Sequence, residues 1–198
     1  MKEIFKKQTF MLMFSIVLGI FTMVLGVGYA FYVFDISVSD TNPAISVKGA
    51  SVDLKITPVS GNLGLCKSYP ISRDYALANC APYIFSVANN NKVDVKMFLN
   101  LEIYNSNTLP ASDVRVSFAE CSDRTCSDGT YTNNLLSKMT VNPDIANQGT
   151  TGYLLSTLEK FGKNNTKYYK VIVWQDEAST VQGGIFRSTI GSVSYSVS

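Results

Sequence analysis

Residues 92–104, KVDVKMFLNLEIY, alternate between apolar and polar side chains along most of their length. The side chains of successive residues in a β-strand point to opposite faces, so residues two apart share a face. One face of this stretch is therefore apolar and holds Val93, Val95, Met97, Leu99, Leu101 and Ile103. A period of two over this length predicts a long strand with one face against a core.

The same period recurs along the chain. We expect further strands at residues 31–38, 45–47, 51–56, 83–87, 114–118, 152–158, 168–174 and 193–198. Residues 168–174, YYKVIVW, are apolar on both faces, which predicts a strand that is covered on both sides. Gly49 and Ala50 shift the alternation and indicate a bulge or kink. Short helices are expected at 72–80 and 132–139. Eight to ten short strands separated by turn residues predict an all-β sandwich or jelly roll.

The N-terminal segment is apolar enough to cross a membrane. Residues 9–34 contain no charged side chain, and a helix with a rise of about 1.5 Å per residue makes them long enough for a hydrocarbon core of about 30 Å. Lysines at positions 2, 6 and 7 precede them, so the positive-inside rule keeps the N-terminus in the cytoplasm. We therefore expect residues 1–30 to form a transmembrane or signal helix, with the rest of the chain outside the cytoplasm.

The end of this segment also fits a cleavage site. Gly28 and Ala30 are small residues at the positions that signal peptidase reads, which places a cut between Ala30 and Phe31. The local pattern leaves two alternatives open. Cleavage by signal peptidase gives a secreted chain, and an uncut chain is a single-pass protein anchored in the membrane through residues 9–34.

The remaining chain divides into an N-terminal strand and linker, residues 31–44, and one domain, residues 45–198. From residue 31 on, there are fourteen basic and fourteen acidic side chains, so this part is neutral. A neutral domain has no basic stripe for a phosphate backbone, and we expect no nucleic-acid partner. Low net charge also removes a barrier to self-association.

The chain has four cysteines, Cys66, Cys80, Cys121 and Cys126. An even number outside the cytoplasm favours disulfides. Three pairings exist, and closeness in sequence favours Cys66 with Cys80 and Cys121 with Cys126. A zinc site is the alternative, but the spacing of the first two cysteines is wider than in structural zinc sites.

Carboxylates supply few candidates for catalysis. Asp176 and Glu177 are neighbours and point to opposite faces of a strand, so we expect them at a solvated strand end rather than as an acid and base pair. Asp123 and Asp128 are expected at a charged hairpin tip, with a calcium site as the alternative although the spacing matches no EF-hand. The chain has no histidine, which removes the commonest general base. The sequence predicts no enzyme activity, no catalytic residue, no metal and no cofactor.

Tyrosines in the expected strands allow two interpretations. Tyr153, Tyr168, Tyr169 and Tyr195 would have to share one exposed face to form a carbohydrate-binding platform. Aromatic rings also pack well on a pleated sheet. We favour core packing.

Several stretches are similar to one protein family. They are GYAF from residue 28, TNPAISVKGASVDLKI from 41, YIFSVANNNKVDVKMFLNLEI from 83, and YYKVIVWQDEASTVQGGIF from 168. Together they resemble the TasA and camelysin family of bacterial cell-surface and biofilm matrix fibre proteins. The shared features include a small-x-Ala-aromatic junction, a turn centred on Gly49, and W-x-x-E-A followed by Q-G-x-x-F between Trp174 and Phe186. The similarity touches most of the chain from residue 26 on.

The resemblance implies an extracellular jelly-roll sandwich from a Gram-positive bacterium. It also implies that the mature N-terminal segment is a donor strand, which completes the sheet of the next subunit by β-strand addition. The donor residues in this chain would be Phe31, Tyr32, Val33, Phe34, Asp35, Ile36, Ser37 and Val38. The four cysteines are not implied by the resemblance, and the protease activity sometimes attached to the family gains no support from a chain without histidine.

We therefore expect a structural protein of the cell surface or matrix, whose partners are further copies of itself or related fibre subunits. A monomeric, membrane-anchored adhesin or binding module, which reads a glycan or a host protein through its loops, is the alternative. An extracellular hydrolase that uses carboxylates is a third hypothesis.

Overall fold

The computed structural model describes residues 46–48, 54–145, 147–181 and 183–197. Four expectations lie outside these residues: the helix at 1–30, the junction at Ala30 and Phe31, the donor strand Phe31–Val38, and the bulge at Gly49 and Ala50. Within the described ranges, no helix is both long and apolar enough to cross a membrane.

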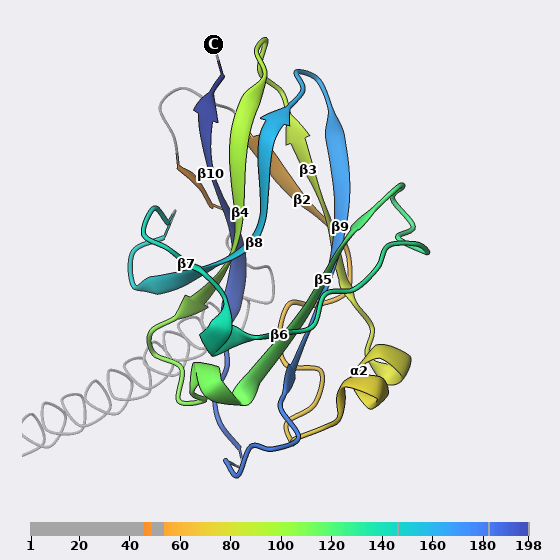
Figure 1. Cartoon of the computed structure of the whole chain (residues 1–198), viewed down its shortest axis with the longest axis vertical. Helices are drawn as coiled ribbons and strands as arrows, with labels where there is room; N and C mark the ends of the chain where they lie inside the picture. The colour runs from red at the N-terminus through yellow and green to blue at the C-terminus, as the bar shows by residue number, and fades with distance from the viewer. Residues whose placement is uncertain (1–45, 49–53, 146, 182, 198) are drawn as a thin grey trace, which may run out of the picture. The chain divides into compact units, whose positions relative to one another are not determined.

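The described part of the chain folds into two five-stranded sheets (Figure 1). Sheet 1 has the order β1 (Ser46–Lys48), β10 (Ser188–Ser196), β4 (Val95–Tyr104), β8 (Thr150–Phe161) and β7 (Val141–Asn142). Sheet 2 has the order β2 (Leu54–Ser60), β3 (Tyr83–Asn89), β9 (Thr166–Gln175), β5 (Val114–Cys121) and β6 (Asn134–Leu135). Neighbouring strands are antiparallel except for β1, which runs parallel to β10. The all-β prediction is confirmed.

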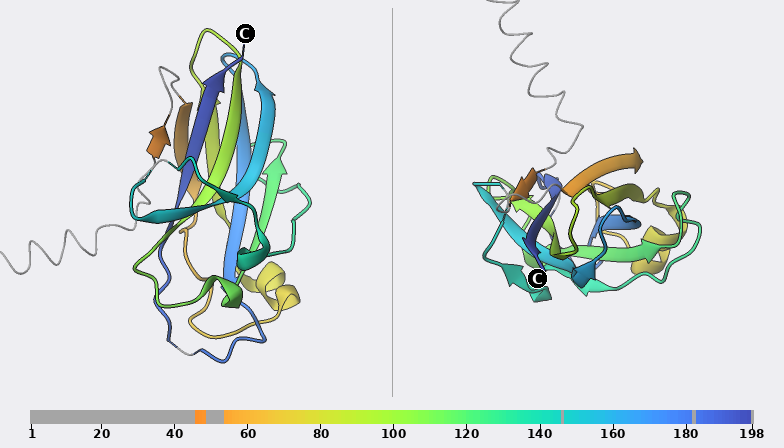
Figure 2. Two further views of the ribbon diagram at one scale, coloured as in Figure 1. Left: turned by 60° about the vertical axis from the view of Figure 1, so that its left-hand side comes forward. Right: turned by 90° about the horizontal axis from the view of Figure 1, so that it is seen from above.

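The core lies between the two sheets, which Figure 2 shows face to face. Met97, Leu99 and Leu101 on β4 are fully buried there, as the alternation predicts. Phe85 and Tyr169 from sheet 2 belong to the same cluster, with ring centroids 5.6 Å apart. Each large apolar side chain contributes about 1.5–3 kcal/mol when fully buried. This core holds the two sheets together as a β-sandwich.

The inward face of β4 begins two residues later than the alternation predicts. Val93 is 48% exposed, because β4 starts at Val95 and Val93 belongs to the preceding turn. The outer face of β4 also departs from the prediction, since Asn100 and Glu102 are fully buried. β7 and the segment after it cover them: Asn142 of β7 donates a hydrogen bond to Asn100 (3.2 Å), and Asn147 donates one to Glu102 (2.5 Å).

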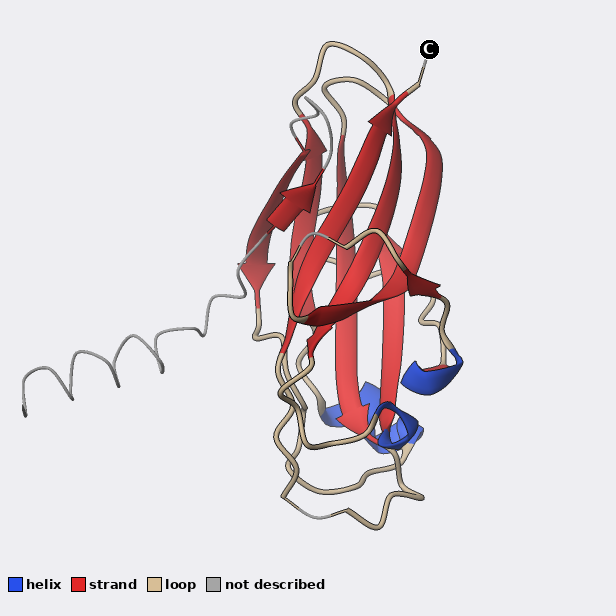
Figure 3. Cartoon of the chain, turned by 90° about the vertical axis from the view of Figure 1, so that its left-hand side faces the viewer, coloured by secondary structure: helices blue, strands red, loops and turns tan. Residues whose placement is uncertain are grey.

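Strand β9 is covered on both sides, as predicted. Its outer side chains Ile172 and Trp174 pack in a second cluster with Ile71, Ala76 and Cys80. The helix α2 (Arg73–Asn79) supplies Ala76 and begins where the Ser72 hydroxyl accepts a hydrogen bond from the Tyr75 N–H (3.3 Å). Figure 3 shows the helices gathered at one end of the strands.

The other helical elements are single turns. The helix expected at 132–139 is reduced to η2 (Leu136–Lys138), and η1 (Ala111–Asp113) precedes β5. Both are 3₁₀ turns, which are typical of connections rather than independent helices.

Candidate functional site

The two sheets come together at β1 and β2, on one side of the sandwich (Figure 2, Figure 3). Only residues 49–53 separate these strands in sequence, so the chain passes from sheet 1 to sheet 2 at this point. We call this side, formed by β1, β10 and β2, the seam. β1 pairs with Gly191–Val193, three of the nine residues of β10.

The outer edge of β2, at the seam, has no partner strand among the described residues. β2 pairs with β3 along one edge, and no other described residue forms a backbone hydrogen bond with it. Leu54 and Ile56 point into the core, whereas Lys55 and Thr57 are exposed. Pro58 lacks an N–H, and the register shifts between Pro58 and Ser60. The usable edge is therefore Leu54–Thr57, because an unpaired row of N–H and C=O groups is a template for another strand.

Three serines of β10 line the seam from the inside. Ser188, Ser192 and Ser194 share the inward face of the strand with the core residue Ile190. Their hydroxyls are buried and have no hydrogen-bond partner in the structure. A buried polar group without a partner costs about 1–3 kcal/mol. Three of the eight buried side-chain polar atoms without a hydrogen-bond partner among the described residues therefore lie on one strand of the seam.

The cysteines form two disulfides. Cys66 pairs with Cys80 and Cys121 with Cys126, at Cα separations of 5.7 and 5.0 Å. This is the pairing that closeness in sequence favours, and it leaves none of the four as a thiolate ligand for zinc. Disulfides persist in oxidising compartments, which fits an extracytoplasmic location.

The loop between Cys121 and Asp128 is organised by its own carboxylates. Asp123 accepts hydrogen bonds from the Thr125 hydroxyl (2.6 Å) and N–H (2.7 Å), and Asp128 accepts one from the Ser122 N–H (3.1 Å). These hydrogen bonds lower the pKa of each carboxyl below its usual value. No group of carboxylates or cysteines in the described ranges is arranged to hold a metal ion. Both carboxylates act as caps of the loop backbone.

Asp176 is buried rather than solvated, which corrects the expectation for this strand end. Its carboxylate forms an ion pair with Arg115 of β5 and accepts a hydrogen bond from the Ala178 N–H (2.9 Å). Burial alone would raise the pKa of Asp176, but the Arg115 guanidinium and the Ala178 N–H hold the pKa below its usual value. Glu177, the next residue, is exposed. The two carboxylates do not form an acid and base pair.

This ion pair gives a prediction for acid unfolding. A carboxyl whose pKa is lowered by folding contributes stability above its unfolded pKa of about 3.9, and that stability is lost as the pH falls through the folded pKa. We expect the free energy of unfolding to fall less between about pH 5 and pH 2 in Asp176→Asn than in the native chain. Urea unfolding at each pH measures this difference. Glu177→Gln is the matched control, and equal slopes for Asp176→Asn and the native chain would contradict the prediction.

The tyrosines do not share a face. Tyr169 is fully buried in the core, and burial raises the pKa of its hydroxyl. Tyr168 lies on the outer side of sheet 2, whereas Tyr195, 46% exposed, contacts Phe98 on sheet 1. Tyr153 packs against the core. These four residues form no common platform for a glycan.

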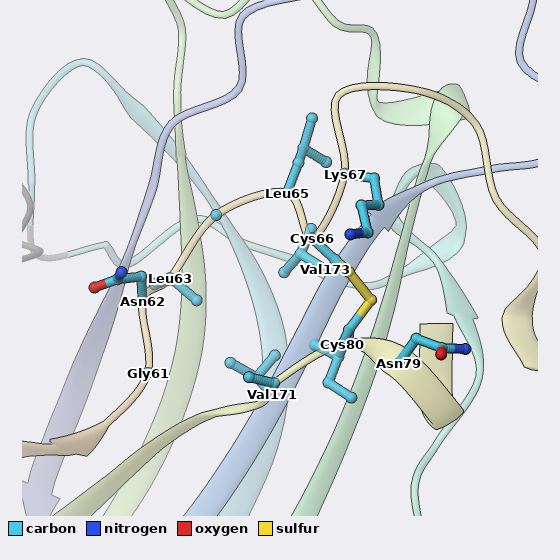
Figure 4. A pocket seen from close by; sticks show the side chains of 13 residues that line it. Gly61, Asn62, Leu63, Leu65, Cys66, Lys67, Asn79, Cys80, Val171 and Val173 are labelled. Carbon is cyan, nitrogen blue, oxygen red and sulfur yellow. A yellow bond between two sulfur atoms is a disulfide. The ribbon is translucent and has the colours of Figure 1, made fainter. Parts of the chain in front are cut away.

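A cleft of about 320 Å³ lies beside the Cys66–Cys80 disulfide (Figure 4). It is bounded by residues 61–67, by the end of α2 and by β9. The Cys66 N–H donates a hydrogen bond to the Val173 carbonyl (2.8 Å). This segment therefore pairs with the part of β9 beyond Val171, which β3 does not reach. Lys67 is the sole titratable side chain among the described residues that line the cleft. The lining offers no pair of groups for general acid and base catalysis.

Comparison with known proteins adds no family. No protein-family model matches the chain, and no curated protein matches it. A solved structure described as "AvmM Catalyzes Macrocyclization in Alchivemycin A Biosynthesis" is similar with a TM-score of 0.35 and 10% identity, over 77% of this chain and 92% of that one. A likeness this distant supports no inference about the activity of this chain.

The sequence reasoning missed the serines of β10. The alternation of valine, tyrosine and serine at 193–198 is visible in the sequence, and the usual assignment places the apolar residues inside. In the structure Ser192 and Ser194 are fully buried and Tyr195 is exposed, while Val193, on the other face from the serines, is buried as well. Ile190 could have revealed this burial, because it lies two residues before Ser192 and therefore on the same face of the strand as the serines.

Proposed function

We propose that this chain is an extracytoplasmic structural protein that builds or decorates a cell-surface or biofilm matrix fibre by β-strand addition. In this proposal it is a jelly-roll relative of the TasA and camelysin group, preceded by the leader or anchor at residues 1–30, and it is not an enzyme. The observation that supports the proposal is the seam, where an edge of β2 that no described strand pairs with lies beside buried hydroxyls that lack partners.

The acceptor is the edge Leu54–Thr57 of β2. A strand added there forms main-chain hydrogen bonds with β2 and covers the interior between β2 and β10. Each such bond contributes about 0.5–1.5 kcal/mol net. A few of them are too weak to hold two copies together, so the added strand must also bury apolar side chains.

The donor is Phe31–Val38 of a neighbouring copy. Tyr32, Phe34, Ile36 and Val38 fall on one face of this segment as a strand. That face supplies apolar area to the interior, and the Tyr32 hydroxyl supplies a partner for a serine of β10. The low net charge of the domain leaves little repulsion between copies.

Replacing Val33 with Pro tests the donor. Pro removes an N–H from the strand and resists the ladder geometry, so we expect cells that express the full chain to lose surface fibres in electron micrographs. The matched control is Ser39→Pro, just outside the donor segment, which should leave fibres in place. Normal fibres from Val33→Pro chains would show that Phe31–Val38 is not the donor.

Two further measurements separate this proposal from the anchored adhesin. N-terminal sequencing of surface material should begin at Phe31 in fibres, whereas an intact Met1 in the membrane fraction supports the adhesin.

Amide hydrogen exchange should slow at Leu54–Thr57 when fibres form and stay unchanged at the opposite edge, β6. Unchanged exchange at both edges would refute β2 as the acceptor.

A further inference from the structure

A shallow trough runs across the outer face of sheet 2, away from the core. Three hydroxyl side chains lie in register there on neighbouring strands: Thr57 of β2 is opposite Ser86 of β3, which is opposite Tyr168 of β9. The trough has a volume of about 250 Å³. Its remaining wall includes Arg124, from the loop that the Cys121–Cys126 disulfide closes.

Two basic side chains lie beside this trough. Arg124 is exposed, and Lys55 is exposed two residues before Thr57 on the same face of β2. Neither forms an ion pair with any residue in the part of the chain that the structure describes. Asp123 and Asp128, in the same loop as Arg124, are anionic and accept hydrogen bonds from that loop, and neither is paired with Arg124 among the described residues.

The loop that presents Arg124 is fixed from below by a buried lysine. Lys170 is only 6% exposed, and its ammonium donates hydrogen bonds to the carbonyls of Cys126 (3.1 Å) and Asp128. The same ammonium lies 4.6 Å from the centre of the Tyr131 ring. With the disulfide and the two aspartate caps, these contacts hold the backbone at Arg124 in one place. A fixed backbone lowers the entropy cost of binding at this loop, although the Arg124 side chain itself must still be ordered by the ligand.

We propose that this trough binds a carboxylated saccharide, one uronate residue of an acidic polysaccharide. The guanidinium of Arg124 matches a carboxylate with two parallel N–H donors, and Lys55 adds a second positive charge. The hydroxyls of Thr57 and Ser86 are donors and acceptors for sugar hydroxyls, and the ring of Tyr168 offers a flat apolar surface.

The size of the trough sets the form of the ligand. Sites that enclose a whole drug-sized molecule have volumes of about 300–1,000 Å³, and this one is smaller and open along the sheet. It therefore takes a single sugar of a longer chain whose neighbouring residues stay in solvent. Affinity from one site is weak, and repeated copies of the protein on one polysaccharide raise it by avidity.

Isothermal titration of the full chain with tetragalacturonic acid tests the proposal. We expect Arg124→Gln to weaken binding by about tenfold, because hydrogen bonds to charged groups are the strong ones. Arg187→Gln is the matched control, the same change at an exposed arginine that precedes β10 of sheet 1. It should leave the affinity unchanged. The neutral methyl ester of the same tetrasaccharide should bind at least about tenfold more weakly than the acid.

Three outcomes would overturn the proposal. Equal losses of affinity in Arg124→Gln and Arg187→Gln would mean that the saccharide is held by general charge attraction. Equal affinities for the acid and its methyl ester would show that the carboxylate is not recognised. Equal or tighter binding of inorganic tetraphosphate would make the trough a site for phosphate rather than for an acidic sugar. Ser86→Ala separates saccharide binding from phosphate binding further, because it should weaken the saccharide and leave tetraphosphate unaffected.

Discussion

Replacing Trp174 with Ala is expected to lower the free energy of unfolding by about 3–5 kcal/mol. Trp174 is fully buried, and it fills the space between β9 and α2 together with Ile71 and Ala76. This second cluster is small, so few neighbours can move in to fill the cavity. A domain of this size has a total stability of about 5–15 kcal/mol, so the loss is a large share of it. Urea unfolding followed by circular dichroism measures it.

A conservative change separates packing from hydrogen bonding at the same position. The indole N–H of Trp174 has no hydrogen-bond partner in the structure. Trp174→Phe keeps an aromatic ring and removes this unsatisfied donor, so we expect a loss well below that of Ala, about 1–2 kcal/mol. Equal losses for Phe and Ala would show that the cluster does not depend on an aromatic ring.

Removing the Cys66–Cys80 disulfide, by Cys→Ala at both positions, is the second large effect. The two cysteines are 14 residues apart, and closing a loop of this length constrains the unfolded chain by about 3 kcal/mol. The folded state also loses a tie between α2 and the segment that extends sheet 2 at Val173. We expect the urea midpoint to fall and the slope of the transition to rise, because the unfolded chain exposes more surface without the crosslink.

The second disulfide serves as an internal comparison. Cys121 and Cys126 are 5 residues apart, for which the same relation gives about 2 kcal/mol. Removing Cys66–Cys80 should therefore destabilise the chain more than removing Cys121–Cys126. The reverse order would mean that folded-state contacts of the shorter loop, including the hydrogen bonds from Lys170, outweigh chain entropy.

Local patterns predicted the elements that depend on local physics. The sequence predicted three such elements: the alternation at β4, the two apolar faces of β9 and the helix that follows Ser72. Each is a property of a few neighbouring residues. The burial of Asn100 and Glu102 was not readable. It comes from Asn142 and Asn147, which are distant in sequence and lie in a segment without periodicity.

The two candidate sites were hidden for the same reason. The row of Thr57, Ser86 and Tyr168 exists because of the register of three strands, which no single strand specifies. The open edge of β2 follows from strand order, and the chain gives no local sign of which strand lies at an edge beyond Pro58. A candidate donor could be named from the sequence, whereas the edge proposed as its acceptor required the fold.

The parallel pairing of β1 with β10 determines how the domain bears mechanical load. Ser46–Lys48 lies alongside Gly191–Val193, so the first and last described strands run side by side in the same direction. A force that pulls the two ends of the chain apart therefore acts along both strands in opposite senses. The hydrogen bonds between them are then strained together in shear rather than peeled one at a time. A tether attached through the N-terminus would load these hydrogen bonds in shear whenever the C-terminal end is held.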